Sequence, residues 1–323
     1  MPAATGDNIA DAELGQIDFS HNGLNNPGAA SLDSPSQMAV DLNSAPEHLF
    51  VVDGNNSRIL GWNNAAGFTN GQKADIAIGQ PDFQTTRCNS GAAGGDVAGV
   101  GPDSLCLPGG VAVDGAGNLY VADTSNNRVL EYDQPFAQSK AVGFQANRVF
   151  GQNGSFTQSV CAQTKAGLCF PQGLASDSSN NLYVADAGNN RVLEFNQPLP
   201  TSDVTADRVF GQGASGTDFI HAKCYDGFGV DPAPSADGLC NLSGLALDSA
   251  GDLFVTDISN SRVLEYLNPL AAGGGSPGLP GSSGDVTADV VFGQAGSFIT
   301  STCGGPAASG ITPSGAVLCV PDG

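Results

Sequence analysis

The sequence is poor in histidine, basic residues and long apolar runs, and each shortage excludes a class of function. Its 323 residues include three histidines and only 11 lysines and arginines, against 32 acidic residues, so the net charge is −21. A field of this sign repels nucleic acid, and we therefore expect no nucleic-acid partner. No apolar run reaches the roughly 18 residues that a transmembrane helix needs, and we expect no membrane span.

Motifs for catalysis and metal binding are also scarce. There is no C-x-x-C pair, and the glycine-rich segment at residues 273–284, which contains the one G-x-S-x-G match (GGSPG), is expected to be a flexible loop. The three histidines, His21, His48 and His221, stand at non-equivalent positions and give no sign of converging on one site. We therefore predict no catalytic residue and no cofactor, and we leave calcium binding open.

The chain is rich instead in an internal repeat. The segment LYVADTSNNRVLEY (residues 119–132) returns at residues 182–195 and 253–266, and in a looser form at residues 49–62. Each copy follows an apolar segment that ends in Asp and precedes a segment related to NRVFGQ (residues 147–152). Alternating β-branched and aromatic residues between turn signals predict four strands in every copy.

Four-stranded units in tandem are typical of β-propeller blades, with a solenoid as the weaker alternative. The segments GGVAVD, GNLYVAD and NNRV (within residues 109–129) resemble the NHL repeat family over most of the chain. The resemblance implies an all-β propeller of four-stranded antiparallel blades in a single domain, residues 1–323. The four complete blades are expected at roughly residues 37–80, 107–152, 170–212 and 241–294.

The two ends of the chain carry partial copies of the repeat. Residues 13–19 (ELGQIDF) match the fourth-strand segment at residues 77–83, so we predict an N-terminal outer strand that closes the propeller. Residues 318–323 (LCVPDG) match the start of a blade at residues 105–110 and predict the beginning of a further blade. We expect a propeller that is incomplete at its C-terminus. Completion of its open edges by a neighbouring chain is the alternative.

Aspartate and arginine recur five residues apart across each predicted hairpin. A carboxylate and a guanidinium at this spacing can form a charge-assisted pair. Repetition in every blade favours a structural ion pair over a ring of substrate ligands, because a catalytic site needs one copy only. The pairs are Asp53/Arg58, Asp123/Arg128, Asp186/Arg191 and Asp257/Arg262.

A second set of aspartates ends the first strand of each predicted blade. Each is expected to start a turn through its side chain, and calcium binding around a channel is the weaker alternative. This set comprises Asp41, Asp114, Asp177 and Asp248. Three N-x-[ST] sequons, at Asn55, Asn153 and Asn241, are candidate glycosylation sites in a secreted protein.

Eight cysteines lie in pairs in the connections between blades. The second member of a pair precedes the strand-ending Asp by eight residues wherever that Asp is present, whereas the first member varies in position. This pattern favours disulfides that pin loops, with zinc binding and reactive thiols as alternatives, and disulfides require an oxidising compartment. The expected pairs are Cys88 with Cys106, Cys161 with Cys169, Cys224 with Cys240, and Cys303 with Cys319.

These features predict an acidic, secreted or cell-surface protein, with the periplasm as a further location. We expect a non-catalytic scaffold that binds a protein or glycan partner, or that has a structural role at the cell surface. The variable disulfide-pinned loops would form the recognition surface, since loops on a rigid scaffold commonly carry binding residues. Two alternatives are a subunit that self-associates through its open blade edges, and a propeller lyase or hydrolase.

Overall fold

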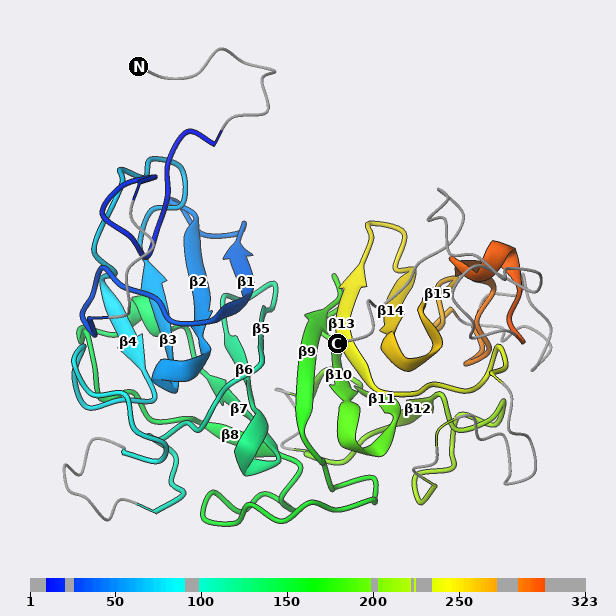
Figure 1. Cartoon of the computed structure of the whole chain (residues 1–323). Coiled ribbons are helices and arrows are strands. Elements are labelled where there is room, and N and C mark those ends of the chain that lie inside the picture. Colours follow the sequence, from blue (N-terminus) through cyan, green and yellow to red (C-terminus); the bar gives the residue numbers. More distant parts are fainter. Residues whose placement is uncertain are drawn as a thin grey trace. The chain divides into compact units, whose positions relative to one another are not determined.

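The architecture comes from a computed structural model of the chain (Figure 1). The structure describes residues 10–20, 26–90, 99–198, 203–221, 224, 234–271 and 284–299. The chain divides into two compact units, one made of Met1–Ser125 and Glu131–Asn147 and the other of Asn126–Leu130 and Arg148–Gly323.

The described residues form four antiparallel sheets of four strands each, in which strands that follow one another in sequence are neighbours in the sheet. We number these sheets blades 1 to 4. Blade 1 contains β1 (Pro35–Asp41), β2 (His48–Asp53), β3 (Arg58–Trp62) and β4 (Ile76–Ile78). Blade 2 contains β5 (Gly110–Val113), β6 (Leu119–Asp123), β7 (Arg128–Tyr132) and β8 (Arg148–Phe150). Blade 3 contains β9 (Pro171–Ser176), β10 (Leu182–Asp186), β11 (Arg191–Phe195) and β12 (Arg208–Phe210). Blade 4 contains β13 (Leu242–Leu247), β14 (Leu253–Asp257), β15 (Arg262–Tyr266) and β16 (Val290–Phe292).

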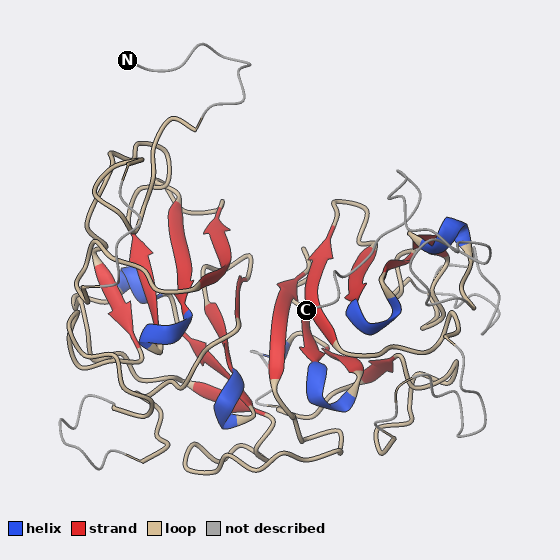
Figure 2. Ribbon diagram, in the orientation of Figure 1, coloured by secondary structure: helices blue, strands red, loops and turns tan. Residues whose placement is uncertain are grey.

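Short 3₁₀ turns join the second and third strands of each blade (Figure 2). These turns are η1 (Gly54–Asn56), η2 (Thr124–Asn126), η4 (Ala187–Asn189) and η5 (Ile258–Asn260). The predicted all-β fold with four-stranded antiparallel propeller blades is confirmed.

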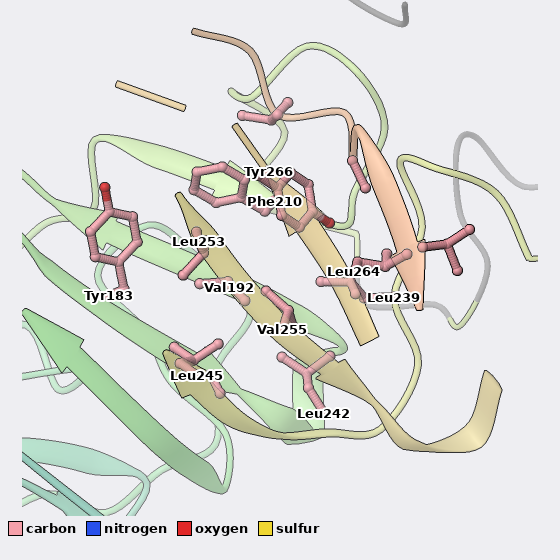
Figure 3. Close-up of a cluster of buried hydrophobic side chains, with 14 residues drawn as sticks. Tyr183, Val192, Phe210, Leu239, Leu242, Leu245, Leu253, Val255, Leu264 and Tyr266 are labelled. Atoms are coloured by element: carbon pink, nitrogen blue, oxygen red, sulfur yellow. The ribbon is translucent and has the colours of Figure 1, made fainter. Parts of the chain in front are cut away.

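The hydrophobic core lies on both faces of the sheets in blades 1 to 3. In blades 1 to 3 nearly every residue of the second and third strands is buried, because both faces of the sheet are covered. Figure 3 shows one such core, in which Tyr183 and Phe210 of blade 3 pack with Leu253 and Tyr266 of blade 4. A separate core in blade 1 surrounds Trp62.

Blade 4 is buried on one face only. Along β14 and β15 buried residues alternate with partly exposed ones, as expected for a sheet with one covered face. On the other face Val290 and Phe292 are 37% and 44% exposed. Blade 4 therefore has a half-exposed apolar face where blade 3 has a buried one.

The predicted N-terminal outer strand is wrong in detail. Residues 13–19 form bends and a turn rather than a strand. The backbone of Glu13 forms hydrogen bonds with Asn70 and Gly71, which lie in the loop between β3 and β4. None of the described strands pairs with residues 13–19. Gly15 nevertheless keeps a left-handed bend (φ +91°) like that of Gly79 (φ +92°). The segment thus retains the turn of the repeat but lacks the partner that would make it a strand. The further blade predicted at residues 318–323, with Cys319 at its start, lies outside the described residues.

Candidate functional site

The repeated Asp–Arg pairs lie at the hairpin between the second and third strands of each blade. Asp53 and Arg58 are directly opposite in the register of β2 and β3, and both are fully buried. The Arg58 Nε–Asp53 Oδ2 distance is 2.6 Å. In the second unit the equivalent distances are 2.7 Å for Arg191–Asp186 and 2.7 Å for Arg262–Asp257. Burial raises the pKa of Asp186 above its ordinary value, and Arg191 opposes that rise.

The remaining donors of each arginine bond to the carbonyl groups of two surrounding loops. Arg58 Nη2 donates to Gly28 O and Ser31 O, both at 3.0 Å, and Nη1 donates to Phe83 O. Arg191 and Arg262 repeat this set, and Arg128 Nη1 donates to Phe156 O at 2.6 Å. Since a guanidinium has five donors, these bonds leave little capacity for a ligand. Each arginine is a structural centre that holds the loops before and after its blade.

The other oxygen of each aspartate holds the disulfide-bearing segment. Asp123 Oδ1 accepts from Cys106 N at 2.7 Å, Asp186 Oδ1 from Cys169 N at 2.6 Å, and Asp257 Oδ1 from Cys240 N at 2.8 Å. In blade 1 Asp33 takes the place of the cysteine, and its N–H donates to Asp53 Oδ1 at 2.6 Å. The aspartate of the ion pair therefore also fixes the start of its blade.

Three of the four predicted disulfides are present in the structure. They join Cys88 to Cys106, Cys161 to Cys169, and Cys224 to Cys240. The fourth predicted pair differs, because Cys303 and Cys319 both lie outside the described residues. A disulfide between Cys303 and Cys319 therefore stays a prediction.

A buried glutamine at the end of the fourth strand completes this framework. Gln80 Nε2 donates to Ser57 O at 2.8 Å and to Arg87 O at 2.9 Å. Equivalent bonds tie Gln152, Gln212 and Gln294 to the hairpin of their own blade. The residues that recur most regularly are therefore engaged within the scaffold.

The aspartates that end the first strands close onto their own turns in blades 2 to 4. Asp177 Oδ1 accepts from Ser179 N and Asn181 N, both at 2.9 Å, and its Oδ2 accepts from Asn181 Nδ2 at 2.7 Å. Burial, together with the nearby Asp177 carboxylate, raises the pKa of Tyr183. Asp114 makes the same set of bonds, with Asn118 and Tyr120 as its side-chain partners. Asp248 accepts from Ala250 N and Asp252 N.

Blade 1 departs from this pattern at two positions. His48 stands where blades 2 and 3 have Asn, and Phe50 stands where they have Tyr. The turn after Asp41 is longer than in the other blades, and Asp41 Oδ1 accepts one backbone bond, from Asn43 N at 3.0 Å. His48 Nδ1 lies 3.5 Å from Asp41 Oδ2, which is longer than a good hydrogen bond. Asp41 is nevertheless only 6% exposed. Asp41 is therefore a largely buried residue whose Oδ2 atom has His48, at a long distance, as its side-chain partner among the described residues.

An aromatic side chain from blade 2 packs beside this carboxylate. The Phe136 ring centroid lies 4.3 Å from that of His48 and 5.3 Å from that of Phe50. Phe136 has room because Gly61 occupies the position opposite Phe50, where blade 3 has Glu194 opposite Tyr183. A Cβ atom at Gly61 would lie 2.7 Å from Ile76 and 3.1 Å from Phe136. The glycine thus permits the aromatic packing.

These residues line a pocket of about 220 Å³ in the first unit, which we call the blade 1 pocket. Its walls are Asp41, Asn43, Ser44, His48 and Phe50 from blade 1, and Gly115–Gly117 with Gln134, Phe136 and Ala137 from blade 2. An equivalent pocket of about 540 Å³ in the second unit, the blade 3 pocket, contains Asp177, Asn181 and Tyr183. Leu270 takes the place of Phe136 there.

The sequence profile of the NHL repeat matches residues 105–132 and 168–195, which hold the second and third hairpins. The chain contains NHL repeats within a β-propeller fold. A comparison with curated proteins finds no match to this propeller.

Solved structures similar to the NHL propeller include the RRP9 WD40 repeats, with 12% identity, a TM-score of 0.43, and coverage of 81% of this chain and 52% of that chain. A streptogramin B lyase has 11% identity and a TM-score of 0.40, with coverage of 76% and 54%. A functionally unknown protein of Desulfotomaculum acetoxidans has 11% identity and a TM-score of 0.41, with coverage of 74% and 53%. The propeller spans about half the length of the structures that it matches.

Of the three histidines, His48 lines the blade 1 pocket in the first unit, whereas His221 belongs to the second unit. His21 lies outside the described residues, and His221 Nδ1 lies 2.6 Å from Asp218 Oδ2, within the connection between blades 3 and 4. Among the residues that are described, no three or more His, Cys, Asp and Glu side chains form a group that could hold a metal ion. The calcium candidates Asp41, Asp114, Asp177 and Asp248 each accept backbone hydrogen bonds from their own turn.

The three sequon asparagines of the propeller are exposed turn residues. Asn55 Nδ2 donates to Asp33 and Ser34, whereas Asn153 and Asn241 have left-handed backbones. Within the described part of the chain, no helix has the length and hydropathy needed to cross a bilayer.

Sequence reasoning placed His48 at the start of a strand but missed its pocket. Comparison of the repeats carries the signal, because His48, Phe50 and Gly61 are the residues at which blade 1 differs from blades 2 and 3. The contribution of Phe136 depends on contact between two blades, which no single repeat encodes.

Proposed function

We propose that this NHL propeller is a non-catalytic binding scaffold that works in an oxidising compartment, at the cell surface or outside the cell. Three disulfides support that environment, since such bonds persist where thiols are not kept reduced. The recurring Asp, Arg and Gln side chains are used within the framework, and this argues against a catalytic role for them. Recognition of a protein partner is assigned to the disulfide-pinned loops.

The residue after the second cysteine of a pair carries this proposal. Leu107 and Phe170 both have left-handed backbones, with φ of 45° and 47°, and their side chains are 45% and 51% exposed. A bulky side chain is disfavoured in this conformation. The Phe170 N–H is fixed by Asn127 Oδ1 at 2.9 Å, and the Leu107 N–H by Ser57 Oγ at 3.3 Å. The framework thus holds an apolar side chain in solvent at a conformational cost.

The same connections expose further apolar side chains. Val160 is 65% exposed in the connection between blades 2 and 3, and Ile220 is 68% exposed in the connection between blades 3 and 4. Both belong to the second unit, as does Phe170. Apolar side chains exposed on rigid loops favour a protein partner, because their burial would supply the binding free energy.

Blade 4 offers the variant that tests this proposal, because Asn241 occupies the position of Phe170 with φ of 52°. Asn tolerates the left-handed region, so we expect Phe170→Asn to stabilise the fold by up to about 1 kcal/mol. The full chain would serve as bait for the extracellular proteins of its source, with chemical crosslinking to identify the partner. Phe170→Asn and Ile220→Ser are expected to weaken the captured complex at least tenfold, with Gly251→Asn as the control. Unchanged affinity in both loop variants would contradict the proposal.

The half-exposed face of blade 4 favours a second candidate function, self-association. Val290 and Phe292 would be buried by a second copy or by another blade. Sedimentation of the purified chain separates the two candidates. A dimer that Phe292→Lys converts to a monomer supports self-association, and a monomer at all concentrations removes it.

A further inference from the structure

The blade 1 pocket lies away from the disulfide-pinned loops assigned above. It is lined by the turn between β1 and β2 and the loop after β7, whereas the disulfides contact the hairpins between second and third strands. In an antiparallel blade these two kinds of connection lie at opposite ends of the strands. A function of the pocket is therefore independent of the loop function.

Asp41 is the group that marks the pocket as a ligand site. In blades 2 and 3 the Oδ2 atom of the equivalent aspartate accepts from an Asn amide, at 2.9 Å in blade 2 and 2.7 Å in blade 3, and in blade 2 a Tyr hydroxyl also lies 3.4 Å from that atom. Blade 1 replaces the Asn, and among the described residues Asp41 Oδ2 has one polar side-chain neighbour, His48 Nδ1 at 3.5 Å. A carboxylate that is about nine-tenths buried needs compensating hydrogen bonds. Blades 2 and 3 supply such hydrogen bonds from their own side chains, and blade 1 lacks the equivalent donors.

The neighbouring backbone keeps this oxygen accessible. Gly117 of blade 2 has φ of +83°, and a Cβ atom built on it would lie 3.2 Å from Asp41 Oδ2. Blade 3 has Asn180 at the equivalent position, also left-handed, with φ of 64°. A side chain at position 117 would therefore cover the oxygen that the glycine leaves open.

The remaining walls combine an aromatic surface with groups that both donate and accept hydrogen bonds. Phe136 packs on His48 and Phe50 and forms the apolar wall. Asn43 and Ser44 line the pocket, and Gln134 uses its amide nitrogen on Ala116 O at 2.9 Å, which leaves its amide oxygen as an acceptor. Among the described residues, His48 Nε2 has no hydrogen-bond partner. The pocket therefore offers one strong acceptor, several mixed groups and one apolar wall.

We propose that the blade 1 pocket binds a single sugar ring, free or at the end of a glycan. A sugar hydroxyl would donate to Asp41 Oδ2, and other hydroxyls would bond with Asn43, Ser44 and His48. The C–H face of the ring would pack on Phe136. The volume of about 220 Å³ is below that of pockets for drug-sized ligands and suits one six-membered ring. Mixed donors and acceptors favour hydroxyl groups over an organic cation, which only donates.

Saturation-transfer NMR of the full chain tests this proposal with named probes: glucose, galactose, mannose, rhamnose and N-acetylglucosamine, with choline and putrescine as cationic competitors. We expect at least one sugar to bind. Gly117→Asn should abolish that binding, because it fills the space beside Asp41. Phe136→Leu, which installs the residue found at Leu270, should weaken binding about tenfold or more.

The repeat supplies a matched control in Gly251→Asn, the same change at the equivalent turn of the blade 3 pocket, where binding should be unchanged. Circular dichroism melts of all variants establish that they are folded. Absence of binding by every sugar, sugar binding that survives both Gly117→Asn and Phe136→Leu, or binding of the amines alone would each overturn the proposal. Phe170→Asn should leave sugar binding intact, so failure of the loop proposal and failure of this one are distinguishable.

Discussion

In the blade 3 pocket, Asp177 accepts two backbone hydrogen bonds and a third from the Asn181 amide, and Tyr183 lies close enough for Asp177 to raise its pKa. In the blade 1 pocket, Asp41 occupies the same place in the repeat and keeps one backbone bond and a distant histidine. The backbone framework around both is alike, with the same Asp–Arg pair at the hairpin. The repeat therefore preserves the scaffold, while the side-chain changes at His48 and Phe50 leave one carboxylate with fewer partners.

The two pockets also differ in the layer beneath them. Glu194 lies opposite Tyr183, is fully buried, and neither of its carboxylate oxygens has a hydrogen-bond partner in the described part of the chain. Burial raises the pKa of Glu194 to about 8, with Asp207 adding to the rise and Arg208 opposing it. Gly61 holds this position in blade 1 and leaves room for Phe136. One blade therefore buries a titratable group where the other has an aromatic wall.

The largest losses of folding stability should follow replacement of the arginine in the buried Asp–Arg pairs, and the loss should be equal in blades 1 and 3. Arg58→Met and Arg191→Met each leave a buried carboxylate without its partner, which costs about 3–5 kcal/mol. Urea denaturation of both variants measures the loss. A much smaller loss for Arg58→Met than for Arg191→Met would mean that the two frameworks differ, and the comparison of the pockets would fail.

The next largest effect should be a pH dependence of the free energy of unfolding that comes from Glu194 of blade 3 and has no counterpart at Gly61 of blade 1. Folded Glu194 titrates near pH 8, and the unfolded group near its ordinary pKa of 4.5, so the folded state binds more protons between these values. Its contribution to stability is fully present below pH 4.5 and is lost as the pH rises through 8, which amounts to about 4 kcal/mol between pH 5 and pH 8.5. Glu194→Gln should remove this part of the pH dependence, measured by denaturation at pH 5 and pH 8.5. Identical slopes in the variant and the wild type would show that Glu194 is not the source.

Loss of a disulfide should give an effect of about 2–3 kcal/mol in the second unit. The Cys161–Cys169 bond closes a loop with a sequence separation of 8. Blade 1 has Asp33 at the equivalent position and should be insensitive to reductant. Hydrogen exchange of the Cys161→Ala/Cys169→Ala variant should therefore show faster opening near β9 and unchanged opening near β2. A uniform change in both blades would contradict this local role.

The smallest effects should come from Tyr120 and Phe50, which occupy the same position of the repeat in blades 2 and 1. Tyr120→Phe removes a hydroxyl that bonds Asp114 Oδ2 at 3.4 Å and should cost about 1 kcal/mol. Phe50→Tyr is the reverse change and should be neutral or slightly stabilising, because the new hydroxyl can reach Asp41. Thermal denaturation of both variants measures the difference, and equal losses in both would show that Asp41 has no unfilled acceptor.

Much of the scaffold could be predicted because it is encoded locally and repeated. The four blades follow from the alternation of apolar residues, and the cysteine pairs from the constant distance between Cys106 and Asp114 and its counterparts. The prediction of an N-terminal strand was wrong because a strand needs a neighbouring strand to pair with, and residues 13–19 form hydrogen bonds with a loop instead. The blade 1 pocket could not be predicted, since Phe136 reaches His48 only after two blades have packed together.

Titration of the wild-type chain and the His48→Asn/Phe50→Tyr variant with the sugar identified by saturation-transfer NMR tests the central claim most directly. The double substitution restores the repeat and gives Asp41 the amide and hydroxyl partners that blades 2 and 3 provide. We predict that the variant folds with wild-type stability or better and loses sugar binding. Binding that persists at wild-type affinity in a folded variant would contradict the account.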